Sequence, residues 1–310
     1  MEKRYAKKMK QELGVLGFGG WQLGNTEFWG EMDFVSGVTL VKEAFENGIN
    51  FFDTAPGYAS GNSERIIGEA VKEFRDQVVI NTKFGHNADG TSNFNVDYIE
   101  HAIDMSLERL QTDYIDSVIL HNPEFYILQG ETDHFVELKR LKDIGKIRGY
   151  GASIDTYPEL LATIRNLDVD VIEIMFNLVH QDIIPLLEEV EEKGIMLVIK
   201  VPLDSGWLSG KYNENSIFTG IRARWDRKTI ENRADIIRRI KDIVNEDNLV
   251  PTALSFLLSF PAVTTVIVGV KNQEQLHSNI SAIKNELDPE TKQKLMDLYQ
   301  NYIVNIDTPW

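Results

Sequence analysis

Short apolar runs alternate along the chain with longer stretches in which apolar residues recur at helical spacing. Continuous rather than alternating apolarity is typical of strands buried on both faces of a parallel sheet. Several of the runs are also rich in valine and isoleucine. The predicted strands are Gly14–Gly19, Ile49–Asp53, Val78–Lys83, Ile115–His121, Ile147–Ser153, Val171–Asn177, Met196–Pro202 and Thr265–Gly269.

The stretches between these runs predict helices, and Pro158 and Pro289 stand where a first helical turn tolerates proline. Strands alternating with helices predict an α/β protein, and eight of them favour a closed (β/α)8 TIM barrel as a single domain over residues 1–310. An open doubly wound sheet is the alternative. The predicted helices are Val38–Asn47, Ser63–Phe74, Val96–Leu110, Asp133–Ile144, Pro158–Asn166, Ile183–Lys193, Asn232–Asn245, Thr252–Leu258, Gln273–Ile283 and Pro289–Val304.

Composition excludes several classes of function. A net charge of −16 argues against a nucleic-acid partner, because binding to phosphates needs a basic face. The chain has no cysteine, and its six histidines show no metal-binding spacing, so we expect no disulfide and no metal. No apolar run is long enough to span a membrane, and Met1–Gln11 does not resemble a secretory signal. We therefore expect a cytoplasmic protein with no membrane partner; no oligomeric state is favoured.

Polar and ionisable side chains stand at or near the carboxyl ends of the predicted strands, where barrels of this kind carry their active sites. Charged groups are costly to bury without a partner or a purpose. Their convergence therefore predicts a functional site at this end of the barrel. These residues are Asp53, Lys83, His121, Ser153, Glu173 and Lys200.

One of these strand ends carries a recognisable motif. The segment Asp53-Thr54-Ala55-Pro56-Gly57-Tyr58, followed by Asn62-Ser63-Glu64-Arg65-Ile66-Ile67-Gly68, resembles the signature of the aldo-keto reductases. The resemblance implies a (β/α)8 barrel that transfers hydride between NADP(H), with NAD(H) as the alternative, and a small carbonyl or alcohol substrate. It continues in Gly17-Phe18-Gly19, Thr82-Lys83, Leu120-His121, Pro202–Tyr212, Val266–Gly269 and Asn279.

The resemblance assigns the family's catalytic tetrad to Asp53, Tyr58, Lys83 and His121. Hydride transfer to a carbonyl leaves an alkoxide that needs a proton, and a tyrosine with a pKa of about 10 is a usable acid. We expect the ammonium of Lys83 to lower the pKa of Tyr58 and Asp53 to hold Lys83 charged. His121 is expected to orient the carbonyl.

The cofactor site is also predicted by resemblance. Gly149-Tyr150-Gly151-Ala152 lacks the third glycine of a Rossmann fingerprint, which argues against that fold. Ser153 and Glu173 are expected to meet the nicotinamide carboxamide, and Leu203, Ser205 and Gly206 the diphosphate, in part through backbone N–H groups. Beyond the last strand, which ends at Gly269, Lys271 is expected to pair with a 2′-phosphate near a helix N-terminus. The remaining predicted contacts are Gln275 and Asn279 with the ribose and adenine, and Trp21 in the substrate pocket.

Two positions depart from the family pattern. The family usually has glutamine where this chain has Glu173, and tyrosine where it has Lys200. Both fall at inward positions on neighbouring predicted strands. We therefore predict that Glu173 and Lys200 form an ion pair under the nicotinamide ring.

Two other functions fit the same motifs. A sugar or polyol dehydrogenase would use the same residues in the oxidative direction, because the chemistry is reversible. A nicotinamide-binding, redox-sensing subunit of a membrane channel would keep the cofactor without turnover. The intact tetrad favours an enzyme.

Overall fold

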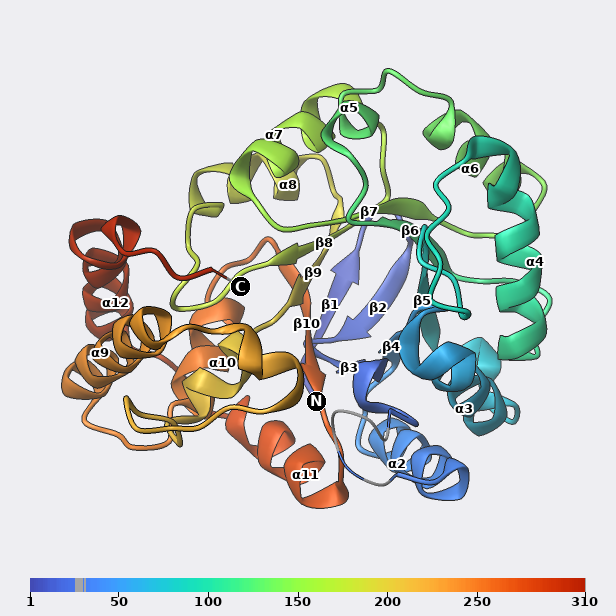
Figure 1. The fold of residues 1–310 in the computed structure, drawn as a ribbon. Helices are drawn as coiled ribbons and strands as arrows, with labels where there is room; N and C mark the ends of the chain where they lie inside the picture. The colour runs from blue at the N-terminus through green and yellow to red at the C-terminus, as the bar shows by residue number, and fades with distance from the viewer. Residues whose placement is uncertain (26–29, 31, 310) are drawn as a thin grey trace.

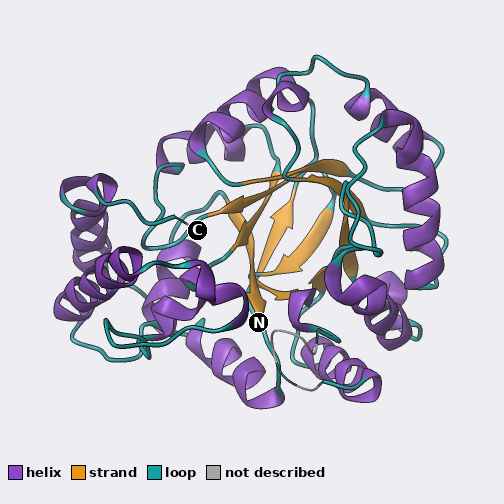
Figure 2. Ribbon diagram, viewed as in Figure 1, coloured by secondary structure: helices purple, strands orange, loops and turns teal. Residues whose placement is uncertain are grey.

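Eight parallel strands close into a barrel in the computed structural model, which describes residues 1–25, 30 and 32–309. The strands follow one another around the barrel in chain order, and β10 pairs with both β9 and β3 to close it. Helices surround the strands (Figures 1 and 2). This confirms the predicted TIM barrel. The strands are β3 (Leu16–Gly19), β4 (Phe51–Asp53), β5 (Val79–Phe84), β6 (Ser117–His121), β7 (Tyr150–Ile154), β8 (Val171–Met175), β9 (Met196–Lys200) and β10 (Val263–Gly269).

The short α5 (Phe125–Leu128) was not predicted, whereas all ten predicted helices overlap helices of the structure, with some shifts at their ends. For example, α9 begins five residues before the predicted Asn232, because the side chain of Asp226 accepts the Thr229 N–H and caps it. None of the helices in the described ranges combines the length and apolarity that a membrane span requires. The helices are α2 (Phe34–Glu46), α3 (Asn62–Val71), α4 (Ile99–Leu110), α5 (Phe125–Leu128), α6 (His134–Asp143), α7 (Tyr157–Asn166), α8 (Leu187–Glu192), α9 (Arg227–Val244), α10 (Val250–Leu258), α11 (Gln273–Ala282) and α12 (Pro289–Asn301).

An antiparallel hairpin of β1 (Lys3–Ala6) and β2 (Gln11–Gly14) precedes the barrel. Leu13 is fully buried and clusters with Phe51 and Met196, residues at the amino ends of their strands. The hairpin therefore closes the end of the barrel opposite the carboxyl ends of the strands. Its charged composition hides it from an apolar pattern, and the sequence analysis did not predict it.

Close packing of α3 on α4 depends on Gly68. A Cβ at this position would lie 2.4 Å from the carbonyl oxygen of Leu110, a backbone atom that cannot turn aside. We predict that Gly68→Ala lowers the free energy of unfolding by about 1–3 kcal/mol in urea denaturation.

Gly37→Ala in α2 is the matched control. Its Cβ would first meet the side chain of Ile66, with Cδ1 at 3.0 Å and Cγ2 at 3.1 Å, rather than a backbone atom, and alanine favours a helix over glycine by about 1 kcal/mol. An equal loss of stability in the two variants would contradict this account of the packing.

Candidate active site

One large cavity opens at the carboxyl ends of the barrel strands, with a volume of about 1300 Å³. This exceeds the roughly 300–1,000 Å³ typical of a site for one small ligand, so there is room for a large cofactor and a substrate. Of the predicted site residues, Lys83 and Ser153 alone do not line it; both lie buried beneath its floor. The predicted residues that line the cavity are Trp21, Asp53, Tyr58, His121, Glu173, Lys200, Leu203, Ser205, Gly206, Gly269, Lys271, Gln275 and Asn279.

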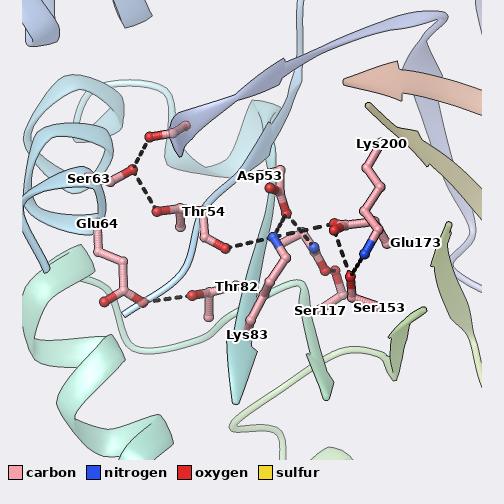
Figure 3. Close-up of polar contacts among 12 residues, drawn as sticks. Asp53, Thr54, Ser63, Glu64, Thr82, Lys83, Ser117, Ser153, Glu173 and Lys200 are labelled. Carbon is pink, nitrogen blue, oxygen red and sulfur yellow. Dashed lines mark hydrogen bonds and ion pairs between the residues drawn. The ribbon is translucent and has the colours of Figure 1, made fainter. Parts of the chain in front are cut away.

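Lys83 stands at the centre of the floor, with a fully buried side chain. Its Nζ lies 2.5 Å from Asp53 Oδ1 and 3.3 Å from Glu173 Oε2, and it donates to Thr54 O at 3.1 Å (Figure 3). Burial alone lowers the pKa of Lys83, but attraction to the two carboxylates outweighs it and raises the pKa. Lys83 is therefore a cation at neutral pH.

Asp53 is held from below by a second chain of hydrogen bonds. Asn81 Nδ2 donates to Asp53 Oδ1 at 2.8 Å, and Ser117 Oγ donates to Asn81 Oδ1 at 2.6 Å. Sequence reasoning missed both residues, although Asn81 precedes Lys83 by two positions and therefore shares its face of β5. Burial, with a further contribution from Glu173, raises the pKa of Asp53 to about 8 against the opposing effect of Lys83.

Tyr58 begins the turn that follows β4, and its ring centroid lies 5.1 Å from Lys83 Nζ. Desolvation raises the pKa of Tyr58, and the charges of Asp53 and Glu173 also oppose the effect of Lys83. Lys83 lowers this pKa as expected, but burial outweighs its effect and the net shift is upward. Tyr58 is therefore a neutral phenol, able to donate a proton.

His121 faces Tyr58 across the cavity, with ring centroids 6.0 Å apart in an edge-to-face arrangement. Burial lowers its pKa well below the ordinary value, and the positive charges of Lys83 and Lys200 add to this effect. Its buried Nδ1 has no hydrogen-bond partner among the described residues. His121 is thus a neutral imidazole with polar capacity to spare for a ligand.

The predicted ion pair between Glu173 and Lys200 was wrong. Lys200 Nζ instead lies 2.9 Å from Asp155 Oδ1 and donates to Ser153 Oγ at 2.8 Å, while Glu173 pairs with Lys83. Asp155 follows β7 and its side chain is 29% exposed, whereas that of Glu173 is 2% exposed, so Lys200 reaches the shallower carboxylate. The hydroxyl of Ser153 stands between Lys200 and Glu173 and donates to Glu173 Oε1 at 2.9 Å.

The loop after β9 is held in an unusual conformation at the cavity edge. Asp204, Ser205 and Gly206 have φ angles of 47°, 54° and 96°, in the left-handed region. The N–H of Gly206 donates to Leu203 O at 2.8 Å. It is therefore not available to a diphosphate, although this loop was expected to bind one in part through backbone N–H groups. The buried carboxylate of Asp204 pairs with Arg233 of α9. This anchor holds the loop in place.

One end of the cavity is cationic, although the whole chain is acidic. Lys271 lines it just before α11, whose first turn is capped by Asn272 accepting the Gln275 N–H at 2.9 Å. Lys211, Arg222 and Arg224 also line the cavity, from the long connection after β9. Sequence reasoning missed these three; the signal was basic residues in a long loop that follows a barrel strand.

No three histidine, aspartate or glutamate side chains in the described ranges are placed to hold a metal ion together. The functional groups of this site are the phenol of Tyr58, the ammonium of Lys83 and the imidazole of His121. Such a site supports proton transfer to or from an oxygen atom in the cavity.

Comparison with known proteins places these features in context. A model described as the aldo/keto reductase family matches residues 15–300. The NADH-specific methylglyoxal reductase of Escherichia coli is 29% identical, with 89% of this chain and 91% of that protein covered. A putative voltage-gated potassium channel subunit beta of Schizosaccharomyces pombe is 28% identical, with coverages of 95% and 92%. The holo form of an aldo-keto reductase from Bacillus halodurans superposes with a TM-score of 0.80 at 25% identity, covering 96% of each chain.

Proposed function

Because the chain belongs to the aldo/keto reductase family, we propose that it reduces an aldehyde or ketone to an alcohol with NADP(H), in a reversible reaction. The observation that carries this proposal is the convergence of Tyr58, Lys83 and His121 on one cavity. The ring of Tyr58 lies 5.1 Å from the ammonium of Lys83 and 6.0 Å from the ring of His121. A neutral acid, a cation and a polar orienting group are what carbonyl reduction needs.

Each residue has one task in this proposal. The reduced nicotinamide, when bound, supplies the hydride to the carbonyl carbon. Tyr58 donates its phenolic proton to the carbonyl oxygen, and Lys83 stabilises the phenolate that remains. Asp53 keeps Lys83 in place, and His121 donates a hydrogen bond that orients the carbonyl. Trp21 on the cavity wall contributes apolar surface for the substrate.

The cavity fits a nicotinamide dinucleotide. Its cationic end suits the phosphates, and the buried Nδ1 of His121 is unpaired among the described residues. Leu203, Ser205 and Gly206 would border the diphosphate, and Gln275 and Asn279 the adenosine. Ser153 and Glu173 lie at the nicotinamide end, and Lys200 beside them. The Escherichia coli relative is named NADH-specific, so the preference for NADP(H) rests on Lys271.

Lys271→Ala tests that preference. A hydrogen bond to a charged group contributes roughly 1.5–3 kcal/mol, so we predict that the Kd for NADPH rises about tenfold while that for NADH stays the same. Fluorescence titration of both cofactors measures it. The control is Lys284→Ala beyond the far end of α11, which is expected to change neither value. Equal effects on NADPH and NADH would contradict a contact with the 2′-phosphate.

The proposed activity is tested by following NADPH and NADH absorbance with a panel of aldehydes, ketones and sugars, and NADP⁺ with sugars and polyols. Oxidation of the reduced cofactor by a carbonyl supports a reductase. Turnover of alcohols alone would favour the dehydrogenase alternative. Cofactor binding without turnover in either direction would favour a redox-sensing subunit, a role suggested by the similarity to the Schizosaccharomyces pombe channel subunit.

A further inference from the structure

A continuous line of polar contacts runs from the partly exposed Asp155 to the buried Lys83. Asp155 Oδ1 lies 2.9 Å from Lys200 Nζ, which donates to Ser153 Oγ at 2.8 Å. Ser153 Oγ donates to Glu173 Oε1 at 2.9 Å, and Glu173 Oε2 lies 3.3 Å from Lys83 Nζ. Figure 3 shows the line from Lys200 inward. Its residues come from β9, β7, β8 and β5, with Asp155 just beyond the end of β7.

The line has a direction. The hydroxyl of Ser153 has one hydrogen and donates it in a hydrogen bond to Glu173. A lone pair of the same oxygen therefore accepts the hydrogen bond from Lys200 Nζ. The exposed fraction of the side chains falls along it, from 29% at Asp155 through 12% at Lys200 to 2% at Glu173. The hydrogen bonds from Lys200 to Ser153 and from Ser153 to Glu173 therefore both point toward the core. Lys200 also contacts Asp155 and donates to Asn122 Oδ1 at 3.1 Å.

The proposed reaction creates a need for such a line. Each reduction takes one proton from Tyr58, which lines the cavity together with the residues expected to hold cofactor and substrate. While both ligands fill the cavity, they stand between Tyr58 and bulk water. The ring of Tyr58 lies 5.1 Å from Lys83 Nζ, so Lys83 offers a route for a proton through the protein.

We propose that Lys200, Ser153 and Glu173 form a proton path from solvent to Lys83 that restores the proton of Tyr58 after each reduction. This proposal rests on the proposed function. It gives the two unusual residues, Glu173 and Lys200, one shared task.

The site holds a proton for the first transfer. Asp53 and Glu173 both contact the single cation Lys83, Asp53 Oδ1 at 2.5 Å and Glu173 Oε2 at 3.3 Å from its Nζ. Burial and Glu173 raise the pKa of Asp53, whereas Lys83 and Lys200 overcome the burial of Glu173 and lower its pKa. At neutral pH the pair therefore carries one proton, on Asp53. Tyr58 and His121 are the other titratable groups that face this pair, and both are neutral.

The transfers balance. Lys83 gives one Nζ proton to the phenolate of Tyr58 and takes the proton of Asp53. The hydroxyl of Ser153 then protonates Glu173 Oε1, and Glu173 turns its carboxyl group and returns this proton to Asp53 through Lys83, which contacts both carboxyl groups. Ser153 Oγ takes a proton from Lys200, and Lys200 takes one from solvent beside Asp155. The sum is one proton moved from solvent to Tyr58, with no electron transferred.

Ser153→Ala removes the hydroxyl that links Lys200 to Glu173 and so interrupts the path. In a stopped-flow experiment, NADPH absorbance reports hydride transfer and a pH indicator in weak buffer reports proton uptake. The wild-type protein should take up its proton as fast as it oxidises NADPH. In Ser153→Ala the ratio of the uptake rate to the hydride-transfer rate should fall about tenfold or more, since a positioned proton donor contributes at least this much.

Two further variants separate the path from a structural role of Ser153. Ser153→Thr keeps the hydroxyl and should restore the ratio, and Lys200→Met breaks the path at another residue and should lower it. An unchanged ratio in both Ser153→Ala and Lys200→Met would overturn the path while leaving the reductase intact. Absence of NADPH oxidation by the wild-type protein with any carbonyl would overturn the proposed function itself.

Discussion

Replacing Tyr58 with phenylalanine is expected to lower kcat/KM for carbonyl reduction about a thousandfold, because the proton donor is removed at the moment the alkoxide forms. The ring remains, and with it the contact with Lys83 at 5.1 Å and the edge of His121. The Kd for NADPH should therefore stay within about twofold of the wild-type value. Steady-state kinetics and a fluorescence titration measure the two quantities.

Tyr299→Phe is the matched control for this variant. Tyr299 is also a buried tyrosine, but it lies in α12, away from the residues that line the cavity. Its replacement should leave kcat/KM unchanged. A Tyr58→Phe protein that reduces carbonyls at the wild-type rate would show that another group supplies the proton.

Replacing Lys83 with methionine is expected to have the largest effect on stability. Asp53 and Glu173 would then share a buried site without a cation, and breaking a buried ion pair from one side costs about 3–5 kcal/mol. Chemical denaturation at pH 9 measures this loss. The triple variant Asp53→Asn, Lys83→Met, Glu173→Gln removes all three charges and should recover most of it.

The loss in Lys83→Met should depend on pH in a definite direction. Without Lys83, the pKa of Asp53 rises further above its present value of about 8, and that of Glu173 rises too. Between its unfolded and folded pKa values, each carboxyl binds a proton only in the folded chain, so stability falls as pH rises. The variant should be closer to the wild type at pH 5 than at pH 9. A penalty that grows toward acid would contradict the shared-cation description of the site.

The barrel could be predicted because burial on both faces leaves a continuous apolar run, and all eight predicted runs overlap strands of the barrel. The position of the site follows from the same pattern, since the carboxyl ends of parallel strands meet at one mouth. The motif around Asp53 and Tyr58 then indicated the kind of chemistry. The hairpin of β1 and β2 escaped because its strands are short and charged, and only Leu13 and a few neighbours are buried.

Partners within the site were harder to predict than its members. Two carboxylates, those of Asp155 and Glu173, lie near Lys200. Their depth in the barrel decides which of them pairs with Lys200, and the more exposed Asp155 does. The pKa of Tyr58 is set first by the burial of its side chain and then by Lys83, Asp53 and Glu173. Neither distance nor burial can be read from residue order. Spacing identified the residues, and the three-dimensional arrangement assigned their contacts.

The central claim is that this cavity transfers a hydride to a carbonyl carbon, and isotope transfer tests it most directly. The protein is incubated with NADPH deuterated at C4 of the nicotinamide and with the carbonyl that is reduced fastest, and the alcohol is analysed by mass spectrometry. Our account predicts one deuterium on the former carbonyl carbon, delivered from one face of the nicotinamide. An alcohol without deuterium from either C4 epimer, or no alcohol from any carbonyl tested, would contradict it.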